Sequence, residues 1–302
     1  MAHVTLPREI LPTDGRFGCG PSKIRTEQLV ALAGPGSALL GTSPRQAPVK
    51  NLVGQVRMGL SDMLRLPAGY EIIVGNGGST AFWDAAAFGL IDKRAQNLVF
   101  GEFGGKFAAA AAAPWLEAPD VRKAEAGSRT RAEAVAGVDV YAWPHNETST
   151  GVAAPVERVH GDEGALTVID ATSAAGGINL RISEADVYYF APQKNLGSDG
   201  GLWFAAVSPA AIERIERFAA SGRYMTLQIP LPDRPGQLAR VSELLSIAGA
   251  NVIEVLHTRH GQGLQISEVI LQLSVETRGE EHRAHVISVL DAAGFHPRVV
   301  ED

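Results

Sequence analysis

The sequence contains one cysteine among its 302 residues, only 6% aromatic residues and no long apolar run. One cysteine can form neither an internal disulfide nor a thiolate metal site, which fits a reducing compartment. A membrane-spanning helix needs roughly 18 apolar residues, and the N-terminus lacks the basic start and apolar core of a signal peptide. Positive charge is not in excess either, because 27 basic and 33 acidic residues give a formal charge of -6. We therefore expect a cytoplasmic protein that binds neither nucleic acid nor membranes.

The residues that are present are those of an ordinary globular chain, and the length favours two domains of roughly 150 residues each. Apolar runs predict buried strands over residues 71–74, 97–100, 138–142, 166–169, 186–190 and 201–207. We expect helices over 49–64, 108–113 and 209–220, and a turn over 75–78 that leads into another helix at 79 or 80. This alternation predicts an α/β domain, with a mostly parallel sheet and helices on both faces.

The pattern changes after residue 222. Strands are expected over 225–231, 251–260, 267–277 and 296–301, with helices over 238–248 and 280–293. The two middle strands are expected to form a hairpin pair, since one of them alternates strictly between apolar and polar residues. The order βαββαβ is that of a ferredoxin-like module. We place the domains at residues 1–222 and 224–302.

Two chemically versatile residues follow predicted strands of the first domain. Lys194 lies just after the strand that ends at residue 190, where open α/β sheets bind their ligands. Its amine can form a Schiff base, or it can be a plain surface lysine. Asp170 ends another strand, and its carboxylate can hold a pyridinium nitrogen protonated. Its alternative role is a cap of the following turn, together with Thr172 and Ser173.

Two further strand ends carry groups that suit a phosphorylated ligand. Gly77-Gly78-Ser79 opens a predicted helix, and bare amides at a helix N-terminus bind phosphate. The segment from His145 to Thr148 follows a third strand, where the Thr148 hydroxyl can bond a phenolic oxygen. The alternatives are a tight strand-to-helix turn and a polar turn. Each signal is weak alone, but all of them fall at strand ends.

Seven motifs occur in one order along the chain: Phe17-Gly18-Cys19-Gly20-Pro21, Thr42-Ser43-Pro44-Arg45, Gly77-Gly78-Ser79, Gly101-Glu102-Phe103, Asn146-Glu147-Thr148, Asp170-Ala171-Thr172-Ser173 and Ala191-Pro192-Gln193-Lys194-Asn195. Over about residues 15–223 this series resembles the phosphoserine aminotransferases of the actinobacterial type. These are fold-type I enzymes that use pyridoxal 5'-phosphate (PLP). The resemblance implies a homodimer that transfers an amino group between L-glutamate and 3-phosphohydroxypyruvate in serine biosynthesis.

The same resemblance implies a role for each matched residue. Lys194 carries the cofactor and shuttles the proton, while Asp170 pairs with the pyridine nitrogen. Phe103 stacks on the ring, and Thr148 contacts the phenolic oxygen. The phosphate is held by Gly78, Ser79 and Gln193. The substrate is contacted by Arg45, whose guanidinium can clamp a carboxylate with two parallel bonds, and by Cys19, for which a small buried apolar side chain is the alternative.

Two departures from the family pattern favour a second hypothesis. Pro44 stands where the family has a histidine near the substrate phosphate. The Asn-Thr-Pro segment that reaches the partner's PLP phosphate is absent from the sequence, and the small C-terminal domain is not recognisable. Without that domain, apolar surface is left exposed. The alternative is therefore an inactive transaminase core fused to a regulatory module.

Residues 225–302 resemble an ACT domain, through Leu231-Pro232-Asp233-Arg234-Pro235-Gly236-Gln237-Leu238 and Gly249-Ala250-Asn251-Val252. The resemblance implies that Asp233, Gly236 and Asn251 bind an amino acid where two modules pair side by side. The alternative is a dimerisation module without a ligand. We expect no metal site, because the pairs His257/His260 and His282/His285 have no evident third ligand.

Overall fold

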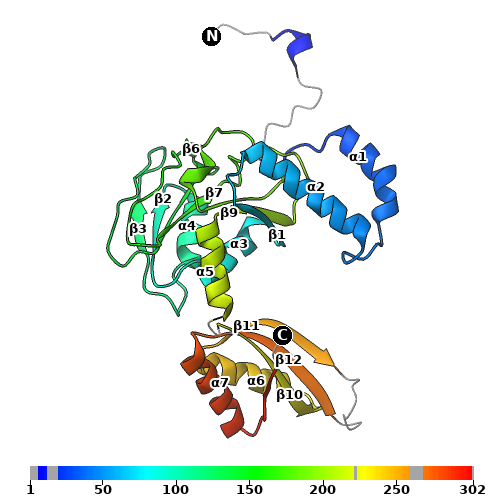
Figure 1. The fold of residues 1–302 in the computed structure, drawn as a ribbon, viewed down its shortest axis with the longest axis vertical. Helices are drawn as coiled ribbons and strands as arrows, with labels where there is room; N and C mark the ends of the chain where they lie inside the picture. Colours follow the sequence, from blue (N-terminus) through cyan, green and yellow to red (C-terminus); the bar gives the residue numbers. More distant parts are fainter. Residues whose placement is uncertain (1–5, 12–19, 221–222, 259–267, 301–302) are drawn as a thin grey trace. The chain divides into compact units, whose positions relative to one another are not determined.

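The computed structural model describes residues 6–11, 20–220, 223–258 and 268–300. It divides into two compact units, Met1–Ala211 and Ile212–Asp302. None of the helices in the described ranges is long and apolar enough to cross a membrane. Figure 1 shows the elements of each unit along the chain.

The first unit is built on a seven-stranded sheet with the order β1-β9-β8-β7-β4-β2-β3. The strands are β1 (Glu71–Asn76), β2 (Ala95–Val99), β3 (Asp120–Lys123), β4 (Val140–Pro144), β7 (Leu166–Asp170), β8 (Val187–Phe190) and β9 (Leu202–Val207). The neighbours from β8 to β3 all pair in parallel, whereas β9 is antiparallel to both β8 and β1. The predicted mostly parallel sheet is thus confirmed, with one reversed strand.

Helices cover both faces of this sheet, as predicted. The helices that pack on the sheet are α2 (Ala47–Leu64), α3 (Gly78–Gly89) and α4 (Glu102–Ala110). Helix α1 (Thr26–Ala33) buries no side chain, most of α5 (Pro209–Ala220) belongs to the second unit, and short 3-10 turns lie at Arg8–Ile10, Pro35–Leu39 and Ile182–Glu184. Tyr188 and Phe190 of β8 share a buried cluster with Leu60 of α2. Tyr189 points to the other face, where its ring stacks on Phe82 of α3 with centroids 4.1 Å apart. Strand residues alternate between faces, so β8 is apolar throughout.

Three local expectations were wrong. The turn expected over 75–78 begins later, because Gly75 and Asn76 still pair with β9. Helix α4 starts at Glu102 and ends at Ala110, before the alanine run is complete. Pro114 follows that run, and a residue before proline avoids the helical conformation. The edge strand β3, whose side chains alternate between partly exposed and exposed, was not predicted because it lacks an apolar pattern.

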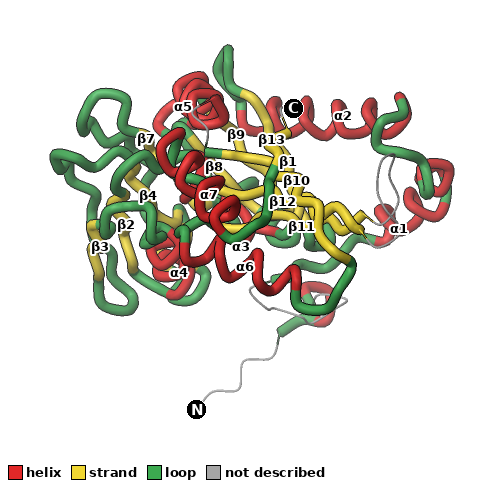
Figure 2. The backbone as a smooth tube through the Cα atoms, turned by 90° about the horizontal axis from the view of Figure 1, so that it is seen from below, coloured by secondary structure: helices red, strands yellow, loops and turns green. Residues whose placement is uncertain are grey.

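The second unit forms a four-stranded antiparallel sheet with the order β11-β12-β10-β13. Its elements are β10 (Tyr224–Pro232), α6 (Gln237–Ile247), β11 (Asn251–Thr258), β12 (Glu268–Glu276), α7 (Glu280–Ala292) and β13 (Arg298–Val300). Leu227, Ile229 and Leu273 of the sheet pack with Leu245 of α6 and Leu290 of α7 in one buried core. Helices α6 and α7 pack on the same face of this sheet. Figure 2 shows the backbone of the two helices and the sheet from below. The predicted βαββαβ order is confirmed; residues 259–267 of the hairpin lie outside the described residues.

Candidate active site

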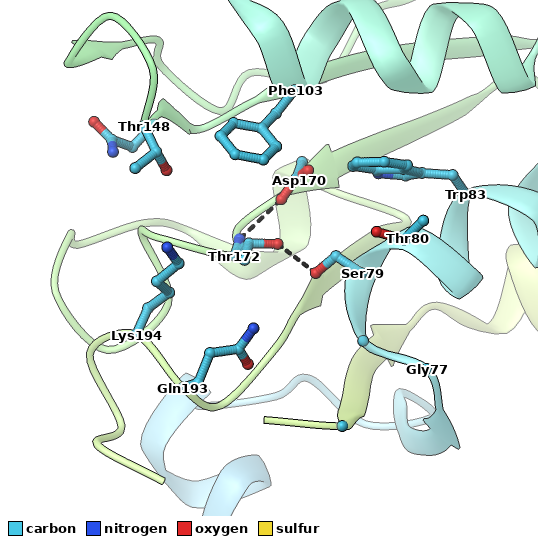
Figure 3. A pocket seen from close by; sticks show the side chains of 13 residues that line it. Gly77, Ser79, Thr80, Trp83, Phe103, Thr148, Asp170, Thr172, Gln193 and Lys194 are labelled. Carbon is cyan, nitrogen blue, oxygen red and sulfur yellow. Dashed lines mark hydrogen bonds between the residues drawn. The ribbon is translucent and has the colours of Figure 1, made fainter. Parts of the chain in front are cut away.

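A pocket of about 400 Å³ opens at the strand ends of the first unit (Figure 3). All seven residues that the sequence assigns to the cofactor line it: Gly78, Ser79, Phe103, Thr148, Asp170, Gln193 and Lys194. Six further residues, which the resemblance did not assign to the cofactor, also line the pocket: Gly77, Thr80, Trp83, Asn146, Thr172 and Gly201. The arrangement brings an amine, a buried carboxylate, an aromatic ring and a helix N-terminus into one cavity.

The N-terminus of α3 forms one end of the pocket. Gly77 and Gly78 have φ of +94° and +66°, a conformation that side chains disfavour, and so allow the sharp turn from β1 into α3. The hydroxyl groups of Ser79 and Thr172 lie 2.6 Å apart and form a hydrogen bond. Free amides at a helix N-terminus together with hydroxyl groups suit a phosphate. The amide side chain of Gln193 adjoins the same end in Figure 3.

Asp170 ends β7 and is buried at the base of the pocket, with 7% of its surface exposed. Burial raises the pKa of its carboxyl, and hydrogen bonds from Thr172 and Tyr189 oppose that rise. The charge of Glu147 adds to the rise. The Thr172 amide donates to Oδ1 of Asp170 at 2.9 Å. A carboxylate held in this way is stabilised by any cationic group that enters the pocket.

Lys194 reaches the pocket from the loop that follows β8. Gly20 packs against its side chain: a Cβ on Gly20 would lie 2.6 Å from Lys194 Cδ and 2.9 Å from Nζ. The φ of Gly20 is +117°, which favours glycine as well. The Ser22 amide donates to the Gln193 carbonyl at 2.7 Å, and its hydroxyl donates to the Lys194 carbonyl. Residues 20–22 therefore hold the lysine loop in place, which sequence reasoning did not foresee.

Glu147 holds residues that line the pocket in place. Its own side chain is fully buried and does not line the pocket. Its carboxylate accepts a hydrogen bond from the Gly104 amide at 2.9 Å, and this bond caps the N-terminus of α4. The carboxylate also accepts from the Ser149 hydroxyl at 2.7 Å. Phe103 lies in the first turn of α4, so this cap sets the place of its ring. The adjacent Thr148 donates to the Ser173 hydroxyl at 2.8 Å. The motif Asn146-Glu147-Thr148 marked this segment in the sequence. The capping role of its central residue, Glu147, became visible only in the folded structure.

The two residues assigned to the substrate are not in this pocket. Arg45 is exposed, just before α2, and does not line the cavity. Cys19 lies outside the described residues. These two assignments thus remain predictions.

A second hollow of about 300 Å³ lies in the second unit, around the turn between β10 and α6. Asp233 and Gly236 line it, together with His257 of β11. Asn251 does not: it pairs with Glu276 at the end of β12, whereas Pro232, beside Asp233, pairs with Glu268 at the other end. One chain therefore brings together two of the three residues assigned to an amino-acid ligand.

The described residues contain no group of three or more His, Cys, Asp and Glu side chains that could hold a metal ion. His282 and His285 have ring centroids 6.4 Å apart, and the Nε2 atom of His282 bonds the Ala248 carbonyl. His260 lies outside the described residues.

Comparison with known families identifies both units. The class-V aminotransferase family matches residues 36–229, and the ACT domain family matches residues 225–295. The chain belongs to the class-V aminotransferase family and carries an ACT domain. This confirms the family predicted from the seven motifs and the fold-type I class of the first domain.

The curated relatives are named for one activity. A "Putative phosphoserine aminotransferase" of Mycolicibacterium vanbaalenii is 60% identical over 231 residues, which is 76% of this chain. A phosphoserine aminotransferase of a Nocardioides species is 58% identical over 75% of this chain. This chain spans about 62% of the length of each of these relatives.

Solved structures share the fold at low identity. A phosphoserine aminotransferase from Cytophaga hutchinsonii has a TM-score of 0.60 at 16% identity, covering 91% of this chain and 97% of its own. A PLP-bound phosphoserine aminotransferase from Trichomonas vaginalis has a TM-score of 0.54 at 17% identity, covering 68% and 63%. At such identities the likeness shows the fold alone.

Proposed function

We propose that residues 1–222 form a PLP-dependent aminotransferase domain that transfers an amino group between L-glutamate and 3-phosphohydroxypyruvate in serine biosynthesis. Residues 224–302 form its ACT domain. The observation that carries the proposal is the pocket itself, in which Lys194 and the buried Asp170 face one cavity with the α3 N-terminus at its edge. The names of the 58–60% identical relatives support the choice of reaction.

The residues of the pocket fit PLP in size, charge and chemistry. The α3 N-terminus with Gly78, Ser79 and Gln193 would hold the phosphate, and the Phe103 ring would cover one face of the pyridine. The Thr148 hydroxyl would bond the phenolic oxygen. When bound, PLP supplies an electron sink for charge that develops on the substrate carbon.

Lys194 and Asp170 would be the two residues that take part directly in the reaction. Lys194 Nζ would bind the cofactor and carry the proton between the two carbons that exchange it. Asp170 would keep the pyridine nitrogen protonated, since its buried carboxylate is stabilised by a cation beside it. Asp170 ends β7, and Lys194 lies in the loop that follows the neighbouring parallel strand β8, so both groups come from the same edge of the sheet.

The substrate side of the proposal involves a second copy of the chain. Arg45 and Cys19 would contact the substrate, but Arg45 does not line the pocket of its own chain. A homodimer, or a movement of the segment before α2, is then needed to bring its guanidinium to a carboxylate. Leu52, Val53 and Val56 of the adjoining α2 are exposed apolar side chains, as a dimer interface would require. We also propose that this dimer is cytoplasmic.

The ACT unit is proposed to bind an amino acid between two copies. The α6 N-terminus at Gly236 offers amides for a carboxylate, and Asp233 can bond the ammonium group. Asn251 begins β11 and pairs with Glu276, at the end of β12 that is far from Asp233, so a ligand that touches all three residues must lie between modules. The edge strand β11 exposes Ile253, Val255 and Leu256, as a paired edge would require.

The test of the function is turnover by the purified chain with PLP, L-glutamate and 3-phosphohydroxypyruvate. We expect 2-oxoglutarate and phosphoserine, and a loss of about 10²–10⁴-fold for Lys194→Ala. Lys106→Ala is the matched control, because Lys106 is exposed and forms an ion pair with Glu102. If the chain shows no turnover, or if Lys194→Ala keeps it, the proposal is wrong and an inactive core joined to a regulatory module replaces it.

A further inference from the structure

Tyr189 is a buried residue beside the pocket that the proposed function does not yet use. It is the register partner of Asp170 across the parallel pair β7–β8, and its side chain has no exposed surface. Paired residues of neighbouring strands point to the same face, so the Tyr189 ring lies next to the Asp170 carboxylate. Hydrogen bonding between the phenol and the carboxyl lowers the pKa of Asp170 and raises that of Tyr189.

The direction of that hydrogen bond follows from a third residue. Trp83 Nε1 lies 2.9 Å from the Tyr189 hydroxyl. An indole N–H can only donate, so the Tyr189 oxygen accepts from Trp83 and its own proton is directed to Asp170. The result is a buried chain of donors, Trp83 to Tyr189 to Asp170. Hydrogen bonds to an ionised group are the strong ones, and neighbouring bonds in such a chain strengthen one another.

Packing leaves the Tyr189 ring little freedom to turn away. Its face stacks on Phe82 at 4.1 Å, and Phe107 meets it edge to face at 6.1 Å. On the other side of Asp170, the Thr172 amide donates to Oδ1. The Asp170 carboxylate thus has possible donors on two sides, the Thr172 amide and the Tyr189 hydroxyl. Figure 3 shows Trp83 and Asp170 on the same side of the pocket, with Lys194 across from them.

We propose that Tyr189 is a positioning residue, which keeps the Asp170 carboxylate ionised and aimed at the ring nitrogen of a bound pyridine cofactor. The inference rests on the proposed function, in which Asp170 pairs with that nitrogen. It adds a residue from a different strand that touches neither the substrate nor the cofactor. Tyr189 acts only on interactions that involve the ring nitrogen, and this separates it from a residue that merely stabilises the fold.

The test compares two probes in the full-length chain: PLP and its deaza analogue, in which a carbon replaces the ring nitrogen. Both carry the same phosphate, aldehyde and phenolic oxygen, so contacts to those groups cancel in the ratio of the two dissociation constants. The wild-type chain should prefer PLP. Tyr189→Phe removes one hydroxyl and keeps the stacked ring, and it should reduce that preference about tenfold, the value of a hydrogen bond to a charged group.

Tyr188→Phe is the matched control. Tyr188 is the adjacent residue of β8, equally buried, and its hydroxyl lies 3.1 Å from His145 Nδ1 on the opposite face. Its loss should destabilise the fold to a similar extent but leave the PLP preference within about twofold. Tight binding of the deaza analogue by both variants would show that they are folded.

Two results would overturn the inference while the proposed function stands: an unchanged PLP preference in Tyr189→Phe, or an equal loss of preference in both variants. A wild-type chain that binds PLP and the deaza analogue equally would remove the role of Asp170, and the inference with it. A wild-type chain that binds neither probe would reject the proposed function itself. A failure of the Tyr189 role, of the Asp170 role or of the proposed function can be told apart, because the affinities of the wild-type chain are measured first.

Discussion

The two units of the chain place their candidate ligands in different physical settings. In the first unit the pocket is formed at the ends of buried parallel strands, and Asp170 has only 7% of its surface exposed. In the second unit the hollow lies on a turn where Asp233, Arg234 and Gly236 are all exposed. A buried charge can act strongly on a ligand because little water screens it, whereas an exposed turn offers mainly amides and shape. The first setting suits chemistry, and the second suits reversible recognition.

The difference starts with the sheets. Parallel strands end at one edge, so residues from β1, β7 and β8 meet at one cavity although they are far apart in sequence. In the second unit, Asn251 begins β11 and Asp233 follows the end of β10. These two strands run in the same direction on either side of β12, so the two residues lie at opposite ends of the sheet. The first unit therefore assembles its candidate site within one chain, whereas one chain does not bring together the three residues predicted to bind an amino acid in the second unit.

The largest expected effects come from the two separate cores. Leu166→Ala in β7 and Leu273→Ala in β12 each remove a buried side chain from a central strand, at a cost of about 2–5 kcal/mol. Each unit has its own core, so each change should lower only one of two calorimetric transitions. Leu273→Ala should also leave the PLP affinity unchanged. A single shared transition, lowered equally by both variants, would contradict the description of two units.

Two buried carboxylates should respond in opposite ways to loss of charge. Asp186 accepts from Arg158 at 2.6 Å, so Asp186→Asn breaks a paired charge and should cost about 3 kcal/mol of unfolding free energy.

Burial raises the pKa of Asp170, so the folded state becomes less stable as pH rises through that pKa and the buried carboxyl ionises. Asp170→Asn should thus stabilise the cofactor-free chain at pH 7 and weaken PLP binding at least tenfold. Urea titration and PLP binding measure the two effects, and a destabilised Asp170→Asn chain would contradict this account.

A smaller, pH-dependent effect is expected at His145. Burial lowers the pKa of this imidazole from its usual 6.5. The unfolded chain therefore takes up a proton that the folded chain resists, so this stability is present above pH 6.5 and is lost as pH falls through the lowered pKa. Each pKa unit corresponds to about 1.4 kcal/mol.

The measurement is the unfolding free energy at pH 7 and pH 5. His145→Gln should lose less stability between these values than the wild-type chain, while His160→Gln, at an exposed position, should behave as the wild type. Equal losses in all three chains would show that His145 does not contribute.

The smallest effect is expected in the ACT hollow. Asp233→Asn should weaken the binding of L-serine, L-threonine or L-isoleucine about threefold to tenfold, the value of an exposed hydrogen bond, without changing the PLP affinity. Asn251→Ala should weaken it as well if two copies share the ligand. Calorimetric titration measures this, and the absence of binding heat from all three amino acids in the wild-type chain would leave the ACT unit as a dimerisation module.

Much of the first site was predictable because its groups follow strands. The apolar runs before Lys194, Asp170 and Gly77 predicted strand ends, and the ends of parallel strands converge. Sequence reasoning missed Tyr189, Glu147 and Gly20, which act through contacts between distant segments. Nothing in a buried apolar strand distinguishes Tyr189 from Tyr188 until the register with β7 is known. Asn251 shows the reverse case: the motifs suggested that it lies near Asp233, but it begins β11 whereas Asp233 follows the end of β10, at the other end of the sheet.

The central claim is that the first unit holds PLP on Lys194, and the most direct measurement is the visible spectrum of the purified chain with added PLP, before and after borohydride reduction. The account predicts a visible absorption band that reduction removes, and a cofactor mass fixed on the peptide that contains Lys194. A chain without the band, or with the label on other lysines, would contradict it.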